Sequence, residues 1–224
     1  MNNILIIAPH PDDEILGCGG FIAKYIAQKK DIYIAVVTNG HLGAPELFPK
    51  EGTQKVQKEA VQSHQFLGVK KTIFLDFPVL QLESNPSYKV SIAISKLINE
   101  FKIDTMLIPH RGDIHKDHRI CFEAALVAAR PLHCSVKKII AYETLSETEW
   151  AAPFGDDAFI PTVFEDVSGF IQNKLDAFKF FTTQQKEFPH PRSLKTIEAL
   201  SQFRGATVGV KNAEAFMLIR EIRA

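Results

Sequence analysis

Short apolar runs and amphipathic segments alternate along the first 142 residues of the chain. The runs are too short for typical helices and rich in β-branched residues, so they predict buried strands over Asn3–Ala8, Ile32–Thr38, Lys71–Leu75, Asp104–Pro109 and Lys137–Tyr142. Between them, apolar positions at helical spacing predict helices over Ile15–Lys29, Thr53–Leu67, Tyr88–Phe101 and Asp117–Ala129. This alternation is typical of a parallel sheet with helices on both faces, so we predict an α/β fold.

The pattern changes after residue 142. Ser146–Asp157 is predicted to be an irregular surface segment, Thr162–Val167 an edge strand and Ser168–Phe181 a helix. Ser193 is a suitable N-cap for a further helix over Leu194–Gly205, and Ala215–Ile219 fits either a short strand or a helix.

Two irregular stretches interrupt the first part of the chain, Asn39–Gly52 and Asp76–Ser87. The first is long for a connection within a compact domain, and such loops are often functional. No repeat, low-complexity tract or linker divides the sequence. We therefore expect one domain over residues 1–224.

Composition excludes several classes of protein. The 26 basic and 26 acidic side chains cancel, which gives no charge argument for a nucleic-acid or anionic-membrane partner. The longest apolar runs are far shorter than the roughly 20 residues that span a bilayer, and no basic region precedes the first run, so we expect neither a membrane span nor a signal peptide. The three cysteines, Cys18, Cys121 and Cys134, form no CxxC pair, which argues against disulfides or a thiolate zinc site and favours the cytoplasm.

Two clusters of ionisable residues follow predicted strands. His10-Pro11-Asp12-Asp13-Glu14 comes after the strand Asn3–Ala8, and the ten residues from His110 to Arg119 come after the strand Asp104–Pro109. Ligands of open α/β sheets bind beyond the carboxyl ends of the strands, and in a parallel sheet these ends share one edge. About 100 residues of separation can therefore close into a single site.

The composition of these clusters suits a hydrolytic metal. Such a site keeps three His or carboxylate ligands and leaves one position open for water. The first cluster supplies His10 and one or two acids, and the second supplies His115 or His118. Nitrogen and oxygen ligands without a thiolate suit Zn²⁺ and also admit Fe²⁺, Co²⁺ or Mn²⁺. The plainer alternative is that Asp12 or Asp13 only caps the following helix, and Glu14 is read first as stabilising the helix dipole.

These residues resemble a known family. Ala8–Glu14 with Gly17, Gly19 and Gly20 is similar to the signature of the PIG-L/LmbE-like zinc deacetylases, N-acetylglucosaminyl deacetylases that include mycothiol and bacillithiol biosynthetic enzymes. His115–His118 resembles the second signature, and Pro189–Ser193 resembles the bacillithiol-type branch. The resemblance implies a three-layer α/β/α, Rossmann-like, mostly parallel sheet. The glycines do not form a dinucleotide fingerprint, so no nucleotide cofactor is expected.

The resemblance also implies roles. His10, Asp13 and His118 would bind the metal, and Asp12 would be the general base that deprotonates metal-bound water. His115, protonated, would stabilise the oxyanion or protonate the leaving amine, and Asp117 would orient an imidazole. One departure concerns substrate binding: where relatives often carry an arginine three residues before the Glu59 position, this chain has Val56.

Other polar residues are given plainer interpretations. Arg111, Asp113 and Arg119 are read as surface charges, His41 and His190 as exposed loop residues near a substrate entrance, and His64 and His133 as structural.

The expected activity is metal-dependent removal of the acetyl group from an N-acetylglucosamine-type amino sugar or its conjugate. Hydrolysis of a non-sugar amide and a non-catalytic sugar- or nucleotide-binding α/β module are the alternatives. The expected partner is the small N-acetylated substrate, and a homo-oligomer is favoured.

Overall fold

The computed structural model of the protein describes residues 1–223, with the side chain of Ser87 excepted. Seven strands form one sheet: β1 (Asn3–Ala8), β2 (Asp31–Asn39), β3 (Lys71–Pro78), β4 (Thr105–Pro109), β5 (Lys138–Tyr142), β6 (Val163–Asp166) and β7 (Ala213–Glu221). Its helices are α1 (Asp13–Ala27), α2 (Gly40–Gly43), α3 (Lys50–Leu67), α4 (Ser87–Glu100), α5 (Lys116–Ala128), α6 (Ile171–Phe178) and α7 (Leu194–Val208), with short 3₁₀ turns at Leu82–Ser84 and Gly155–Asp157.

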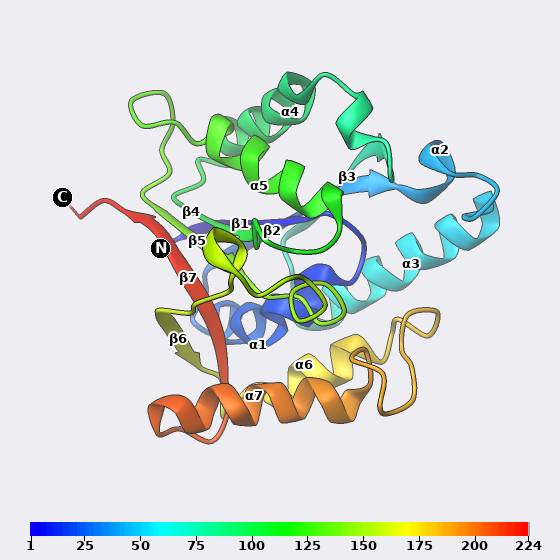
Figure 1. Cartoon of the computed structure of the whole chain (residues 1–224). Coiled ribbons are helices and arrows are strands. Elements are labelled where there is room, and N and C mark those ends of the chain that lie inside the picture. The colour runs from blue at the N-terminus through cyan, green and yellow to red at the C-terminus, as the bar shows by residue number, and fades with distance from the viewer. Residues whose placement is uncertain (224) are drawn as a thin grey trace.

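The strand order is β3-β2-β1-β4-β5-β7-β6. The first five strands in this order run parallel, and β7 pairs antiparallel with both β5 and β6. Helices α4 and α5 cover one face, and α1, α3, α6 and α7 cover the other (Figure 1). The predicted three-layer, mostly parallel α/β fold is confirmed.

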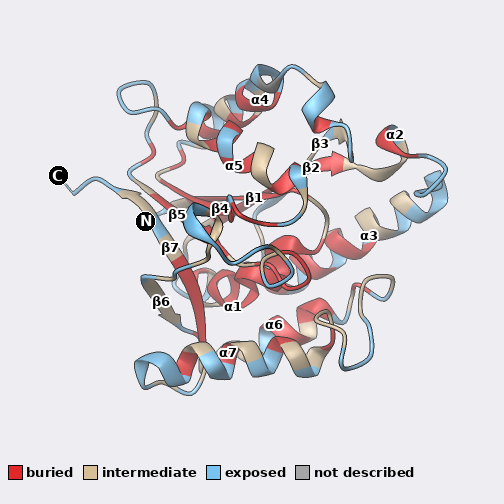
Figure 2. Ribbon diagram, viewed as in Figure 1, coloured by how far each residue is buried: buried red, intermediate tan, exposed pale blue. Residues whose placement is uncertain are grey.

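The central strands are apolar on both faces because each face is covered. In β1, Ile4 and Ile6 pack into the core beside α1, whereas Leu5 and Ile7 pack into the core beside α4 and α5. All four side chains are fully buried, as the red central strands in Figure 2 show. This explains why β1 is a continuous apolar run with no polar alternation.

Several element boundaries differ from the sequence-based prediction. The stretch after β2 is not wholly irregular: Asn39 caps α2 by accepting a hydrogen bond from the Leu42 N–H at 3.3 Å, and α3 already begins after Pro49. Conversely, α6 is shorter than the predicted helix Ser168–Phe181. The Ala215–Ile219 segment belongs to strand β7, because β5 and β6 both pair with it.

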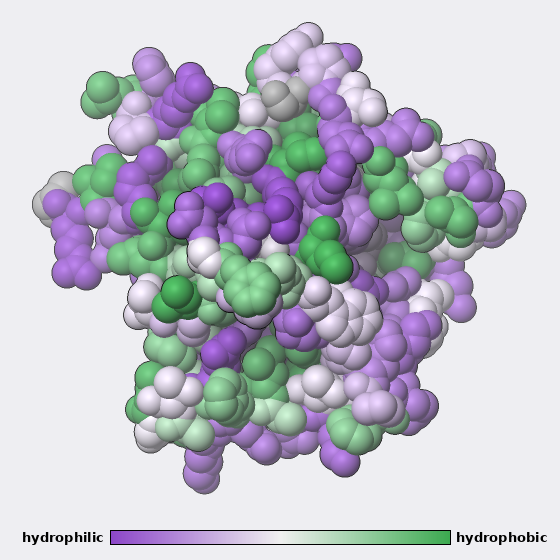
Figure 3. Space-filling view, viewed as in Figure 1, coloured by the Kyte–Doolittle hydropathy of each residue, from purple (hydrophilic) through white to green (hydrophobic). Residues whose placement is uncertain are grey.

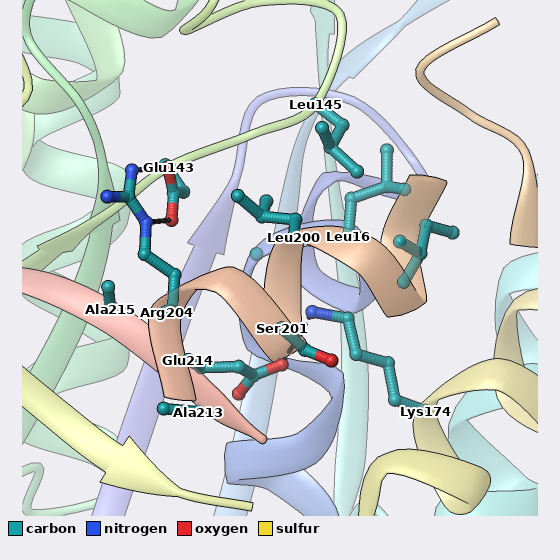
Figure 4. Close-up of a pocket in the computed structure, with 12 residues that line it drawn as sticks. Leu16, Glu143, Leu145, Lys174, Leu200, Ser201, Arg204, Ala213, Glu214 and Ala215 are labelled. Carbon is teal, nitrogen blue, oxygen red and sulfur yellow. Dashed lines mark hydrogen bonds and ion pairs between the residues drawn. The ribbon is translucent and has the colours of Figure 1, made fainter. Parts of the chain in front are cut away.

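The end of the chain is fastened to α1 by a buried ion pair. Lys174 of α6 lies 2.6 Å from Glu214 of β7, and Glu214 also accepts the N–H groups of Gly20 and Phe21. Lys174 and Glu214 border a cavity of about 10 Å³, beside which Arg204 pairs with Glu143 (Figure 4). Such a volume is about that of one water molecule, so this region serves packing rather than ligand binding.

The outer surface carries mixed side chains. On the face seen in Figure 3, apolar and polar residues are interspersed. Within residues 1–223, no helix combines the length and apolar character needed to cross a membrane.

Candidate active site

The strand order places both ionisable clusters at the centre of the sheet. From β1 the chain moves outward through β2 to β3, and it then returns to β4 on the other side of β1. The crevice between the carboxyl ends of β1 and β4 is therefore the switch point at which such sheets bind ligands. The segment after β1 carries His10 to Glu14, and the segment after β4 leads through His115 into α5.

His10, Asp13 and His118 converge at this point. Ligand atoms of the three side chains all lie within 4.8 Å of one another. His118 Nε2 is 3.2 Å and His10 Nδ1 is 3.4 Å from the same carboxylate oxygen, Asp13 Oδ2. Asp13 and His118 are fully buried, whereas His10 is partly open to the cleft. The structure thus brings together the three residues that the family resemblance implied as metal ligands.

Asp113 fixes the orientation of His118. Its Oδ2 lies 2.8 Å from His118 Nδ1, and its Oδ1 accepts a hydrogen bond from Thr148 at 2.6 Å. Asp113 is fully buried, so the interpretation of this residue as a surface charge is wrong. An orienting carboxylate behind a ligating histidine is the usual second shell of a metal site. Its position in the cluster after β4 was the only sequence signal for this role.

Arg119 and Arg111 were both expected to be surface charges, but they lie in different environments. Arg119 donates hydrogen bonds to the carbonyl oxygens of Gly112 and Asp113, so it braces the segment that holds Asp113 rather than being a free surface charge. Arg111 remains half exposed and only approaches Asp157, at 3.8 Å.

Two buried atoms without a hydrogen-bond partner are available to a cation between these side chains. Among the described residues, buried Asp13 Oδ1 and His118 Nε2 have no hydrogen-bond partner. If Nδ1 of His118 carries the proton shared with Asp113, Nε2 presents a lone pair to the Asp13 carboxylate. Two acceptors 3.2 Å apart repel each other unless a proton or a metal ion lies between them.

The ionisation of the cluster shows that positive charge is favoured beside Asp13. Burial by itself raises the pKa of Asp13, but His118 and His10 outweigh it and hold the pKa well below its usual value. Burial lowers the pKa of His10, but hydrogen bonds to Asp117 and Asp13 outweigh it and raise the pKa to about 9. The site therefore stabilises an anionic carboxylate surrounded by positive charge.

A second possible set, His10 with His115 and Asp117, fits a metal less well. Asp117 Oδ2 already accepts the Leu80 N–H at 3.0 Å and lies 3.3 Å from His10 Nε2. His115 Nδ1 accepts the Asp117 N–H at 3.1 Å, which makes His115 the N-cap of α5. Asp117 is thus placed to orient the imidazole of His10.

His115 is neutral in this environment. Burial, together with the nearby His10, lowers the pKa of His115 to about 4. This environment therefore does not favour, at neutral pH, the protonated His115 that the family resemblance implied. Since Nδ1 accepts a hydrogen bond, the neutral ring carries its proton on Nε2 and remains a hydrogen-bond donor.

Asp12 does not cap α1 with its side chain. Its backbone has φ 116°, and its carbonyl rather than its carboxylate accepts the first helical N–H groups, from Ile15 and Leu16. A non-glycine residue in this conformation is strained and needs support from its surroundings. The Asp12 N–H donates to Glu14, and Glu14 in turn lies 2.8 Å from His64 Nε2. Glu14 is thus a fully buried support of this turn and not merely a first-turn helix charge.

Arg192 is the site residue that the sequence interpretation missed. Its guanidinium lies 3.1 Å from the Asp12 carboxylate, 2.9 Å from Gln184 and 2.8 Å from the Ser146 hydroxyl. Burial raises the pKa of Asp12, and the positive charge of Arg192 lowers it. The negative charges of Asp13 and Glu14 raise the pKa further, so it lies at about 7. The turn Pro189–Ser193 contained the only signal, which was its resemblance to one branch of a family.

These residues open into a cleft of about 370 Å³. His10, Asp12, His115 and Arg192 line it, and so does Glu147, which belongs to the segment predicted to be irregular surface. Val56 also lines the cleft. His41 and His190 are not among the lining residues; His190 Nδ1 accepts the Arg192 N–H at 3.0 Å and so shapes the turn behind the cleft.

The sequence has clear relatives. Residues 5–129 match the PIG-L family, which is described as GlcNAc-PI de-N-acetylase. An Escherichia coli protein named uncharacterized deacetylase YaiS is 33% identical over 183 residues, which cover 79% of this chain and 88% of that protein. Diacetylchitobiose deacetylase of Thermococcus kodakarensis is 27% identical over 200 residues, which cover 84% of this chain and 71% of that protein.

Solved structures share the fold. N,N'-diacetylchitobiose deacetylase from Pyrococcus horikoshii superposes with a TM-score of 0.78 at 21% identity, over 98% of this chain and 84% of that one. A 4-carboxy-2-hydroxymuconate hydratase from Pseudomonas putida gives the same TM-score at 15% identity, over 100% and 98% of the two chains. The fold alone therefore does not decide between deacetylation and hydration. The match over residues 5–129 and the 33% identity to the Escherichia coli protein do decide the family: this chain belongs to the PIG-L family.

Proposed function

We propose that the protein is a metal-dependent deacetylase that hydrolyses the N-acetyl group of an N-acetylglucosamine-type amino sugar or its conjugate. The observation that carries this proposal is the convergence of His10 with the buried Asp13 and His118, beside which Asp12 lines an open cleft. Family membership and the names of relatives such as diacetylchitobiose deacetylase support an N-acetylated sugar as the substrate.

His10, Asp13 and His118 would hold the metal, with Zn²⁺ favoured and Fe²⁺, Co²⁺ or Mn²⁺ also suited to these ligands. A divalent cation in such a site lowers the pKa of water from about 15.7 towards about 7 and polarises a carbonyl group. Asp113 would keep the His118 lone pair directed at the ion, and Asp117 would hold the His10 ring.

Asp12 would act as general base and then as general acid. Its carboxylate takes a proton from the attacking water as oxygen adds to the acetamide carbon. With a pKa of about 7 it can return that proton to the nitrogen as the C–N bond breaks, which releases acetate and the free amine. Because neutral His115 holds no additional proton, we assign it hydrogen-bond donation from Nε2 to the developing oxyanion.

The test is the Asp12→Asn variant. It keeps the size of the side chain but has no basic carboxylate, so we expect loss of acetate release from N-acetylglucosamine derivatives while bound metal, measured by elemental analysis, stays at the wild-type level. Full activity of this variant would refute the role of Asp12. Absence of stoichiometric metal in active wild-type protein would refute the metal centre.

Three further properties belong to this proposal. The sheet takes strands from residue 3 to residue 221, which supports one domain over residues 1–224.

The free cysteines Cys18 and Cys121, both buried, support a reducing cytoplasmic location that cell fractionation tests. Homo-oligomerisation stays a prediction, and light scattering of the purified protein measures it.

A further inference from the structure

The cleft has two chemically different walls. The polar wall comes from the segments after β1, β4 and β5 and from the Arg192 turn, and it surrounds the candidate metal centre. The other wall comes from the segments after β2 and β3, and its apolar side chains are Leu47, Phe48, Pro49, Val56 and Val79. Because β2 lies beside β1 and β3 lies beyond it, this apolar wall extends from the metal centre towards one edge of the sheet.

The apolar wall is held in place rather than loosely exposed. The N–H groups of Leu47 and Phe48 both donate to the Ala44 carbonyl, at 3.0 and 2.8 Å. Phe48 packs so closely on Gly40 that a Cβ added there would lie 2.9 Å from the Phe48 Cβ. On α3, Thr53 and Val56 are three residues apart and therefore face the cleft together.

Two of these side chains are costly to leave in water. Leu47 is 63% exposed and Phe48 is 40% exposed, although both line the cleft. An apolar group bound against them would remove this surface from water, which is the main source of affinity in ligand pockets.

The charges in the cleft do not favour an anionic group at this wall. Arg192 is the only lysine or arginine among the described residues that line the cleft. Its charge is already matched by Asp12 at 3.1 Å, with Glu147 at 3.7 Å. An anionic substituent placed against Leu47, Phe48 and Val56 would therefore meet no lysine or arginine among the described residues of this wall.

We propose that this wall is a subsite for a neutral, apolar aglycone, such as an aryl or alkyl group joined to the N-acetylated sugar. The proposal rests on the deacetylase function and specifies its substrate class. The acetamide lies at the metal centre, the neutral side chains Thr53 and Gln57 are available to sugar hydroxyls, and the aglycone lies against Leu47, Phe48 and Val56.

The test compares free N-acetylglucosamine with its phenyl and 4-carboxyphenyl glycosides, each as both anomers. The two glycosides differ only by a carboxylate. For the better anomer, we expect kcat/KM for acetate release from the phenyl glycoside to exceed that of the free sugar and of the carboxyphenyl glycoside by about 10-fold each. Equal or higher values for the free sugar or the carboxyphenyl glycoside would overturn the proposal.

Two variants locate the effect. Val56→Arg places a cation in the apolar wall and should abolish or reverse the preference for phenyl over carboxyphenyl. Val127→Arg makes the same substitution on an exposed position of α5 outside the cleft and should leave the preference unchanged. An unaltered preference in Val56→Arg would overturn the assignment of this wall.

A binding measurement tests the apolar subsite independently of the proposed deacetylation. Calorimetry with the zinc-loaded Asp12→Asn variant measures Kd for the phenyl and carboxyphenyl glycosides without turnover. Tighter binding of the phenyl glycoside, together with no acetate release by the wild type, would retain the apolar subsite and refute the deacetylase. Acetate release with equal Kd and equal kcat/KM for the two glycosides would retain the deacetylase and refute the subsite.

Discussion

Arg192 controls the ionisation of Asp12, and its replacement by glutamine tests this directly. The guanidinium and the carboxylate are 3.1 Å apart, and the side chain of Arg192 is only 18% exposed. At an effective dielectric constant of about 20, Coulomb's law gives an attraction of about 5 kcal/mol at this distance. Desolvation and rearrangement of water offset part of it, and an arginine neighbour typically lowers an aspartate pKa by about 1–3 units.

The sign follows from the role of Asp12. Only the ionised carboxylate takes a proton, so activity is lost as the pH falls through the pKa of Asp12. With a pKa of about 7, half of the molecules are ionised at pH 7. If Arg192→Gln raises this pKa by one unit, roughly one tenth are ionised, which lowers kcat/KM at pH 7 about fivefold and restores it above about pH 9. A metal ion bound by Asp13 lowers the pKa in both proteins, so the predicted quantity is the difference between them.

The assay is acetate release as a function of pH, from 5 to 9.5, for the wild type and the variant. Arg204→Gln is the matched control, because Arg204 is also 18% exposed and also pairs with a glutamate, Glu143, but lies outside the cleft. We expect the acidic limb of the kcat/KM profile to move upward for Arg192→Gln and to stay in place for Arg204→Gln. An unmoved limb in Arg192→Gln would show that Arg192 does not set the ionisation of the base.

Three other predictions follow from the site and the fold. Asp113→Asn weakens the orientation of His118 and should lower zinc affinity by about 10- to 100-fold in a chelator competition. Replacement of the exposed Asp156 by Asn is the control and should leave zinc affinity unchanged. Equal zinc affinities of Asp113→Asn and the wild type would refute a role of Asp113 at the metal site. His115→Gln should lower kcat by about 100-fold or more with unchanged metal content, and an unaffected kcat would contradict its role at the oxyanion. Glu214→Ala leaves Lys174 buried without its partner and should lower the free energy of unfolding, measured by urea denaturation, by about 3–5 kcal/mol. The double variant Lys174→Met, Glu214→Leu should recover much of this loss. An unchanged free energy of unfolding in Glu214→Ala would refute the importance of the pair.

The fold class, and the placing of both ionisable clusters at one edge of the sheet, could be predicted from the sequence. The run Ile4–Ile7 had to be buried on both faces, and such strands alternating with amphipathic helices leave few alternatives to a parallel α/β sheet. Loops after parallel strands emerge at one edge of the sheet, so His10 and His118 could be predicted to lie close together although they are far apart in the sequence. Local patterns were sufficient for this prediction because strand direction alone sets that edge.

Roles that depend on contacts across the fold were decided only by the tertiary structure. Asp113 looks like a surface charge in the sequence, but it is fully buried against His118, and the partly exposed Arg119 donates to the backbone of the segment that holds it. Arg192 reaches Asp12 across 180 residues because its turn closes over the same edge of the sheet. The ionisation of His115 likewise depends on burial and on His10, neither of which is a property of its neighbours in the chain.

The difference has one physical reason. Hydrophobic periodicity records which face of an element is buried, and that information is local. The pKa values, the second shell around His118 and the apolar wall of the cleft depend on distances between side chains from different elements, which strand order and packing set. Patterns along the chain therefore predicted which residues meet at the edge of the sheet, whereas the contacts from which we propose their roles come from the packing of different elements.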